Sequence, residues 1–178
     1  MELYELFGKR DFLPSNALLK FLAETVCKVP ETRFVCYDIL FLICGYDLSN
    51  LNKTRLPVYI SHSPAGTSMR DLVHFSQMVR SDKFQRYDYG SKTENMKHYG
   101  QADPPVYNVT QMTTPTVLFW AEDDWLADST DVKQLISNIQ NLLGSYEIDN
   151  WNHLDFIWGV DAAKIVYDKI IKIMKEHP

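Results

Sequence analysis

The feature that most constrains the fold is an alternation of short strands and amphipathic helices in the C-terminal third of the chain. Residues 116–120 read TVLFW, a run of β-branched and aromatic residues that is typical of a buried strand. The pattern then predicts a helix over residues 129–143 that ends at Gly144, a second strand over residues 146–148, and a last amphipathic helix over residues 161–175. This order of strand, loop and helix, given twice, indicates a parallel α/β sheet.

The first ~110 residues do not show this alternation and indicate a helical unit set apart from the sheet. An amphipathic helix is predicted over residues 15–27 and another over residues 67–79, while residues 34–44 are apolar nearly all round. Residues 45–66 contain many Gly, Asn, Pro and Ser residues and are predicted to be mainly loop. Residues 80–105 are polar, rich in Tyr and predicted to be irregular.

Charge and hydropathy exclude two classes of protein. Eighteen Lys and Arg residues against 23 Asp and Glu residues give a net charge of -5, which argues against a nucleic-acid binder. No apolar run approaches the ~20 residues that a transmembrane helix requires. The N-terminus is charged from its second residue and has no apolar core of a signal peptide, so we expect no secretory signal in this chain.

The cysteines and the glycosylation triplets leave the compartment open. Cys27 and Cys36 flank a short polar connection and would close it as one loop in an oxidising compartment, whereas Cys44 is predicted to be a buried free thiol. No His or Cys lies at zinc-like spacing to the pair, so we expect no metal site. Two N-x-[ST] triplets begin at Asn52 and Asn108, and such triplets also arise by chance.

Polar residues follow both predicted strands, where functional residues of open parallel sheets are found. Asp124 lies in the acidic loop after the first strand, and His153 lies in the loop after the second. A carboxylate followed by a histidine is the closing order of α/β-hydrolases, in which the carboxylate orients the imidazole that acts as general base. The alternative is an acidic surface loop and an incidental histidine.

Longer motifs around these two residues resemble the acid lipase family, which includes the gastric and lysosomal acid lipases. The resemblance covers essentially the whole chain and rests on DWLAD at residues 124–128, NHLDFIWG at 152–159, HSPAGTS at 62–68 and FQRYDYG at 84–90. It implies a partial α/β-hydrolase fold of the α/β class. Residues 1–107 would form most of a helical cap, with a lid between about Phe12 and Cys44, and residues 108–178 would form the C-terminal part of the core sheet.

By position, the resemblance implies that Asp124 is the aspartate and His153 the histidine of a catalytic triad. The two are 153 − 124 = 29 residues apart, which leaves room for one helix and one strand. This sequence has AEDD where the family usually has glycines, so Asp123 is a second carboxylate next to Asp124. The WLAD residues that follow favour Asp124, and we expect Glu122 and Asp123 to face solvent.

The resemblance also implies roles for the cysteines and for the two glycosylation triplets. Cys27 and Cys36 match the family's disulfide pair, and Cys44 matches its free thiol. Asn52 and Asn108 become candidate glycosylation sites.

The nucleophile is missing. The motif G-x-S-x-G occurs nowhere in the 178 residues, and its nearest imitation, residues 66–70, lacks the second glycine. We expect Ser63 and Ser68 to be loop and cap residues. Without a nucleophile and an oxyanion hole, a His–Asp pair cannot form an acyl-enzyme.

Two hypotheses follow. In the first, the chain is the C-terminal portion of a serine ester hydrolase that acts on triacylglycerols or cholesteryl esters at a lipid–water interface, is inactive alone and needs the missing N-terminal half. That parent would be secreted or lysosomal, and no cofactor is expected. In the second, the chain is a truncated, non-catalytic product that binds lipid or a partner.

Overall fold

The computed structural model describes residues 11–12, 28–29, 31, 34, 38, 44–45 and 49–177. The chain divides into two compact units. The first unit consists of Met1–Asn16 and His62–Asn108, and the second of Ala17–Ser61 and Val109–Pro178. The helix predicted over residues 15–27 lies outside the described residues, as do Cys27 and Cys36.

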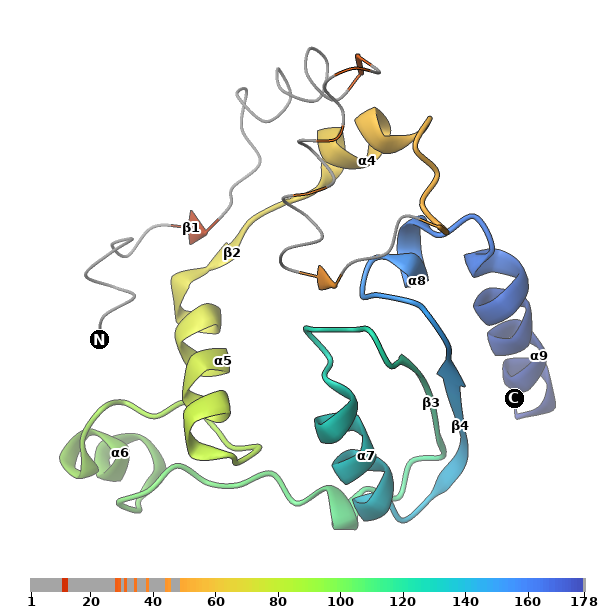
Figure 1. Ribbon diagram of the computed structural model, residues 1–178. Helices are drawn as coiled ribbons and strands as arrows, with labels where there is room; N and C mark the ends of the chain where they lie inside the picture. Colours follow the sequence, from red (N-terminus) through yellow and green to blue (C-terminus); the bar gives the residue numbers. More distant parts are fainter. Residues whose placement is uncertain are drawn as a thin grey trace. The chain divides into compact units, whose positions relative to one another are not determined.

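The second unit is built on a parallel pair of strands, β3 (Thr116–Ala121) and β4 (Leu142–Ile148) (Figure 1). A single turn of 3-10 helix, η1 (Val109–Gln111), precedes β3. Helix α7 (Ser129–Asn138) connects the two strands, as a parallel pair requires. Ala121 at the end of β3 lies opposite Ile148 at the end of β4, so both strands finish at the same edge. The predicted order of strand, helix and strand is confirmed.

The boundary between α7 and β4 differs from the prediction. Helix α7 ends at Asn138, and Gly144 lies inside β4 instead of ending a helix. Residues along β4 are alternately exposed and half-buried, which is the period of a strand. The ring of Tyr146 lies beside Gly144, only 3.1 Å from where a Cβ would be, so the glycine makes room for an aromatic residue on the same face.

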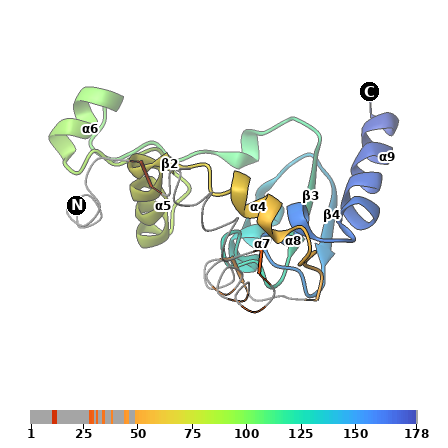
Figure 2. The same ribbon diagram turned by 90° about the horizontal axis from the view of Figure 1, so that it is seen from above.

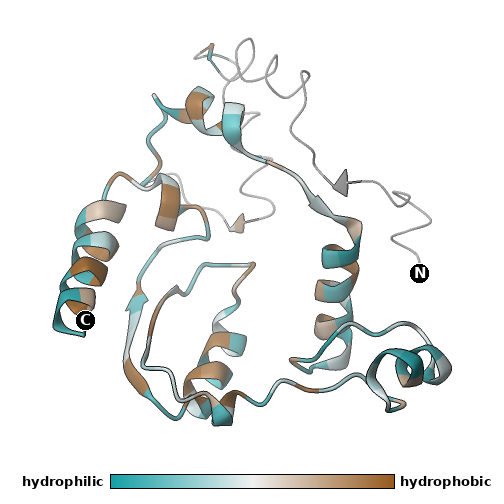
Figure 3. Cartoon of the chain, turned by 180° about the vertical axis from the view of Figure 1, so that it is seen from behind, coloured by the Kyte–Doolittle hydropathy of each residue, from teal (hydrophilic) through white to brown (hydrophobic). Residues whose placement is uncertain are grey.

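Helix α9 (Asp168–Glu176) packs beside the sheet and continues a π-helical turn, η2 (Ala163–Tyr167), which confirms the last predicted helix. Figure 3 shows hydrophobic and hydrophilic residues interleaved along α9, as expected for a helix with one apolar face. Phe119, Ile148, Phe156 and Ile170 pack against a cluster of buried residues in this unit, which consists of Ala121, Trp151, Ala162 and Val166.

A helix lies within the segment predicted to be mainly loop. Helix α4 (Leu56–His62) sits beside the short helix α8 (Asp155–Trp158), and Figure 2 shows them next to each other. Tyr59 stacks on Trp158 with ring centroids 5.0 Å apart, and Leu56 is completely buried. The packing of Leu56 and Tyr59 stabilises α4, although the Gly, Asn and Pro content of this segment disfavours a helix.

In the first unit, β1 (Asp11–Phe12) pairs antiparallel with β2 (Thr67–Ser68). Helix α5 (Met69–Ser81) follows, close to the predicted bounds, and Ser68 caps it by accepting a hydrogen bond from the backbone N–H of Arg70 at 3.0 Å. Ser68 is thus the N-cap residue of α5.

Helix α6 (Lys92–Tyr99) lies within the segment that was predicted to be irregular. The sequence of α6 has little apolar periodicity, and polar contacts hold this helix instead. Buried Asn95 donates to Asp88 Oδ1 and to the carbonyl of Ala102, and it accepts from the backbone N–H of Tyr89. Hydropathy patterns do not register such bonds, which explains the wrong prediction.

None of the helices in the described ranges has the length and apolar character needed to span a membrane.

The cap of α7 gives a first prediction. Asp128 Oδ1 accepts from the backbone N–H of Thr130 at 2.8 Å, and this bond lowers the pKa of the Asp128 carboxyl. Asp128→Ala should lower the free energy of unfolding by about 1 kcal/mol at neutral pH, whereas Asp128→Asn keeps an acceptor and should cost less.

The stabilisation from Asp128 should depend on pH. Because the folded-state pKa is lowered, the contribution is complete above the ordinary pKa of 3.8 and is lost as the pH falls through the folded-state value. Urea unfolding of the wild type and of Asp128→Ala, at neutral and at strongly acid pH, measures the difference. A difference of the same size at both pH values would contradict the prediction.

Candidate active site

The loops after β3 and β4 bring Asp124 and His153 together. His153 Nδ1 lies 3.0 Å from Asp124 Oδ2. The Asp124 side chain is 4 % exposed and that of His153 is 41 % exposed, so the carboxylate is buried behind an accessible imidazole. Because an ionised carboxylate only accepts hydrogen bonds, Nδ1 donates, and Nε2 is left as the basic nitrogen. This is the arrangement of a general base with its orienting carboxylate.

The loop after β3 fixes the Asp124 carboxylate. Its second oxygen, Oδ1, accepts hydrogen bonds from the backbone N–H groups of Leu126 and Ala127, each at 2.8 Å. Asp123 and Glu122 are exposed. Of the two adjacent aspartates, it is thus Asp124 that faces His153.

The loop after β4 is held by a capping arrangement that the sequence analysis missed. Asn152 Oδ1 accepts from the backbone N–H groups of Leu154 and Asp155, at 2.8 and 3.2 Å. Asp155 Oδ2 in return accepts from the backbone N–H of Asn152 at 2.7 Å. Reciprocal bonds between a cap residue and the residue three positions later are those of a capping box, so the spacing N-x-x-D was the available signal. The loop that carries His153 is therefore held by hydrogen bonds on both sides of the histidine.

A distant segment contacts both loops. The carbonyl of Cys44 accepts from the backbone N–H of His153 at 3.2 Å, and the carbonyl of Gly45 accepts from Asn152 Nδ2 at 2.9 Å. The Cys44 thiol is buried, and burial, together with the negative charge of Asp124, raises its pKa.

A mostly apolar cavity of about 300 Å³ adjoins the pair. Asp124 and His153 are the charged or titratable residues in its wall. The remaining lining residues are apolar: Leu118, Phe119, Trp120, Ala127, Val132, Leu135, Phe156 and Ile157. An apolar cavity with a few polar groups at one side is the usual form of a small-molecule site.

Two of the remaining predicted site residues, Asn52 and Asn108, lie in the described part of the chain. Asn52 is half-buried and its Oδ1 accepts from the backbone N–H of Arg55, whereas Asn108 is exposed. The proposed disulfide of Cys27 with Cys36 lies outside the described residues. Within the part of the chain that the structure describes, no group of three or more His, Cys, Asp or Glu residues is placed to hold a metal ion.

Relatives of known activity match nearly all of this chain. It is 46% identical over 173 residues to lysosomal acid lipase/cholesteryl ester hydrolase of Macaca fascicularis, a match that covers 97% of this chain and 43% of the relative. Gastric triacylglycerol lipase of Homo sapiens is 45% identical over 171 residues, covering 96% of this chain and 43% of the relative. Lipase lipl-1 of Caenorhabditis elegans is 43% identical over 176 residues, covering 97% of this chain and 43% of the relative.

No protein-family model matches the chain. The chain spans well under half the length of the curated relatives it matches. The relatives nonetheless confirm the resemblance to the acid lipase family: over almost all of its length, this chain is homologous to a part of these lipases.

The surroundings of Cys44 give a second prediction. Asp124→Asn removes the negative charge that disfavours the thiolate, so the pKa of Cys44 should fall and its alkylation at fixed pH should become faster. Asp123→Asn is the matched control, because Asp123 is exposed and should leave the rate unchanged. Mass spectrometry of the Cys44 peptide after timed iodoacetamide treatment measures both rates. Equal rates in the wild type and in Asp124→Asn would contradict this account.

Proposed function

We propose that this chain is the C-terminal portion of an acid-lipase-like serine ester hydrolase that acts on neutral lipids, either triacylglycerols or cholesteryl esters. The observation that carries the proposal is the 3.0 Å contact between His153 and buried Asp124 at the shared edge of a parallel strand pair. The names of the relatives, cholesteryl ester hydrolase and triacylglycerol lipase, supply the substrate classes.

In the proposed reaction, a serine from a part of the protein outside this chain attacks the ester carbonyl while His153 Nε2 accepts the serine proton. Asp124 keeps the imidazole in the tautomer with hydrogen on Nδ1 and stabilises the imidazolium. His153 then gives the proton to the departing alcohol, which leaves an acyl-enzyme. Water hydrolyses that intermediate by the same proton transfers in the same order.

Apolar surface around the dyad supports a lipid substrate. The cavity beside His153 is lined mainly by apolar side chains. Trp125, Leu126 and Ile157 lie in the same two loops or next to them and are 60%, 38% and 66% exposed. We propose that this surface contacts acyl chains or a lipid–water interface, because exposed apolar residues around a polar site bind apolar ligands.

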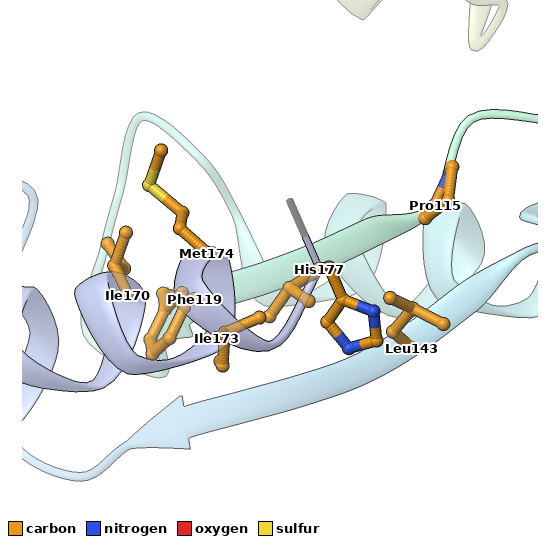
Figure 4. Close-up of a pocket in the computed structure, with 8 residues that line it drawn as sticks. Pro115, Phe119, Leu143, Ile170, Ile173, Met174 and His177 are labelled. Atoms are coloured by element: carbon orange, nitrogen blue, oxygen red, sulfur yellow. The ribbon is translucent and has the colours of Figure 1, made fainter.

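A second hollow, of about 670 Å³, lies between α9 and the sheet. We propose that the N-terminal part of the parent protein packs against it. Figure 4 shows the wall of this hollow, in which Ile173 and Met174 come from the end of α9, His177 follows that helix directly, and Phe119 and Leu143 come from the strands. Among the described residues β3 pairs with β4 alone. An open strand edge beside an apolar hollow is the place where further strands and helices of an α/β-hydrolase core would pack.

The domain division at residues 107 and 108 is part of this proposal. Residues 1–107 would contribute the cap and lid, and residues 108–178 the end of the core sheet. Helix α4 packs through Tyr59 on Trp158, so we extend the division by assigning α4 to the base of the cap, where it meets the core.

The proposed parent is secreted or lysosomal, as the names of the lysosomal and gastric relatives suggest. In that compartment Cys27 and Cys36 would form a disulfide and Asn52 and Asn108 would carry glycans. Asn108 is exposed and Asn52 is half-buried, so we expect fuller glycosylation at Asn108.

A test of the dyad uses the parent protein. Asp124→Asn and His153→Ala should each lower kcat for a short-chain ester by about 10⁴-fold or more, because the proton acceptor or its tautomer is lost. His98→Ala is a control on a histidine that stacks on Tyr89 in the first unit, and it should leave kcat within about twofold of the wild type. Wild-type activity in His153→Ala would exclude the proposed base.

The isolated chain provides a separate test. Because it lacks G-x-S-x-G, the purified 178-residue protein should not hydrolyse p-nitrophenyl butyrate above the background rate. Circular dichroism, run in parallel, establishes that the sample is folded. Hydrolysis that persists in the folded chain and disappears with His153→Ala would contradict the need for an external nucleophile. Lipid binding without hydrolysis by either the chain or the parent would favour the non-catalytic alternative.

A further inference from the structure

We infer that Gly45 and Asn152 are positioning residues that set the geometry of the Asp124–His153 pair. We use the name strap for Cys44 and Gly45. The strap lies against both loops of the site. This inference rests on the proposed function, because it assigns a role to the strap in the action of that pair.

The two loops need a connection beyond the sheet. Strand pairing ends where Ala121 lies opposite Ile148, and the side chains of Asp124 and His153 come three and five residues later. Their 3.0 Å contact therefore depends on how each loop is held after the last paired residues. A displacement of about 1 Å at such a contact is enough to cost about 10²-fold in rate.

The strap supplies that connection on the His153 side through two hydrogen bonds. The Cys44 carbonyl accepts from the backbone N–H of His153 itself, and the Gly45 carbonyl accepts from Asn152 Nδ2. Asn152 is fully buried, and its Oδ1 is occupied by two backbone N–H groups of the same loop. A shift of Gly45 would leave a buried amide N–H unpaired, so the free energy of that lost bond opposes the shift.

On the Asp124 side the strap lies so close to the loop that it leaves no room for a side chain at Gly45. A Cβ on Gly45 would lie 2.2 Å from the carbonyl oxygen of Asp123 and 3.1 Å from Cβ of Asn152. Gly45 also has φ of +99°, a conformation that residues with side chains rarely adopt. Only glycine fits between the residue before Asp124 and the residue before His153, so a side chain there would push the two loops apart.

The test compares matched glycine variants of the parent protein. Gly45→Ala introduces both the strained φ and the clash, whereas Gly90→Ala introduces the strain alone, since Gly90 has φ of +86° and nothing within 4 Å of a Cβ. We expect Gly45→Ala to lower kcat by about 10²-fold with little change in KM, and Gly90→Ala to leave kcat per folded molecule unchanged.

A second pair of variants covers the case in which Gly45→Ala does not fold. Asn152→Asp keeps the acceptor for Leu154 and Asp155 but removes the donor to Gly45. Asn95→Asp is its control, because Asn95 is likewise a buried amide, in the first unit, and donates to Asp88 and Ala102. A loss of kcat in Asn152→Asp and not in Asn95→Asp supports the positioning role, and equal kcat per folded molecule in the two overturns it.

A spectroscopic readout separates this inference from the proposed function. In protein with ¹⁵N-labelled histidine, the Nδ1–H of His153 that is bonded to Asp124 should give a downfield proton resonance that Asp124→Asn abolishes. Gly45→Ala should weaken or shift this resonance, and Gly90→Ala should not. An unchanged resonance in folded Gly45→Ala overturns the positioning role even if His153 proves catalytic. If the resonance changes in Gly45→Ala but the wild-type parent hydrolyses no ester, the positioning role stands and the proposed hydrolase function is wrong.

Discussion

The parallel pairing of β3 with β4 is the constraint on which the candidate site depends. Parallel strands end at one edge, so the loop that carries Asp124 and the loop that carries His153 emerge side by side although 29 residues separate the two side chains. An antiparallel pair would send consecutive loops to opposite edges. The hydrogen bond at the dyad is thus a consequence of strand direction, and helix α7 is the connection that makes this direction possible.

Beyond the last paired residues, order in the site comes from hydrogen bonds to backbone groups. Two N–H groups hold the Asp124 carboxylate, and a capping box holds the loop around His153. A buried carboxylate with these donors stays oriented toward the imidazole, while the exposed side of His153 remains open to a reacting group. The strap at Gly45 adds a contact from a distant part of the sequence.

Much of this could be predicted from the sequence where the signal is local and apolar. TVLFW identified β3, and the order of Asp124 and His153 after successive strands identified the pair. Predictions failed where tertiary contacts dominate. Helix α4 packs through Tyr59 on Trp158, and α6 is held by the bonds of Asn95. Gly144, predicted to end a helix, lies inside β4. The role of Gly45 has no local signature, since its partners lie about 80 and 107 residues further along the chain.

The most direct test of the central claim is a crystal structure of the parent protein inactivated by an alkyl phosphonate, which would be trapped on the nucleophile. We predict that His153 Nε2 lies within hydrogen-bond distance, about 2.6–3.2 Å, of the serine oxygen bonded to phosphorus, and that Asp124 is still hydrogen-bonded to Nδ1. Phosphonylation of a residue out of reach of His153, or a different histidine at that oxygen, would contradict the assignment of Asp124 and His153 as the catalytic pair.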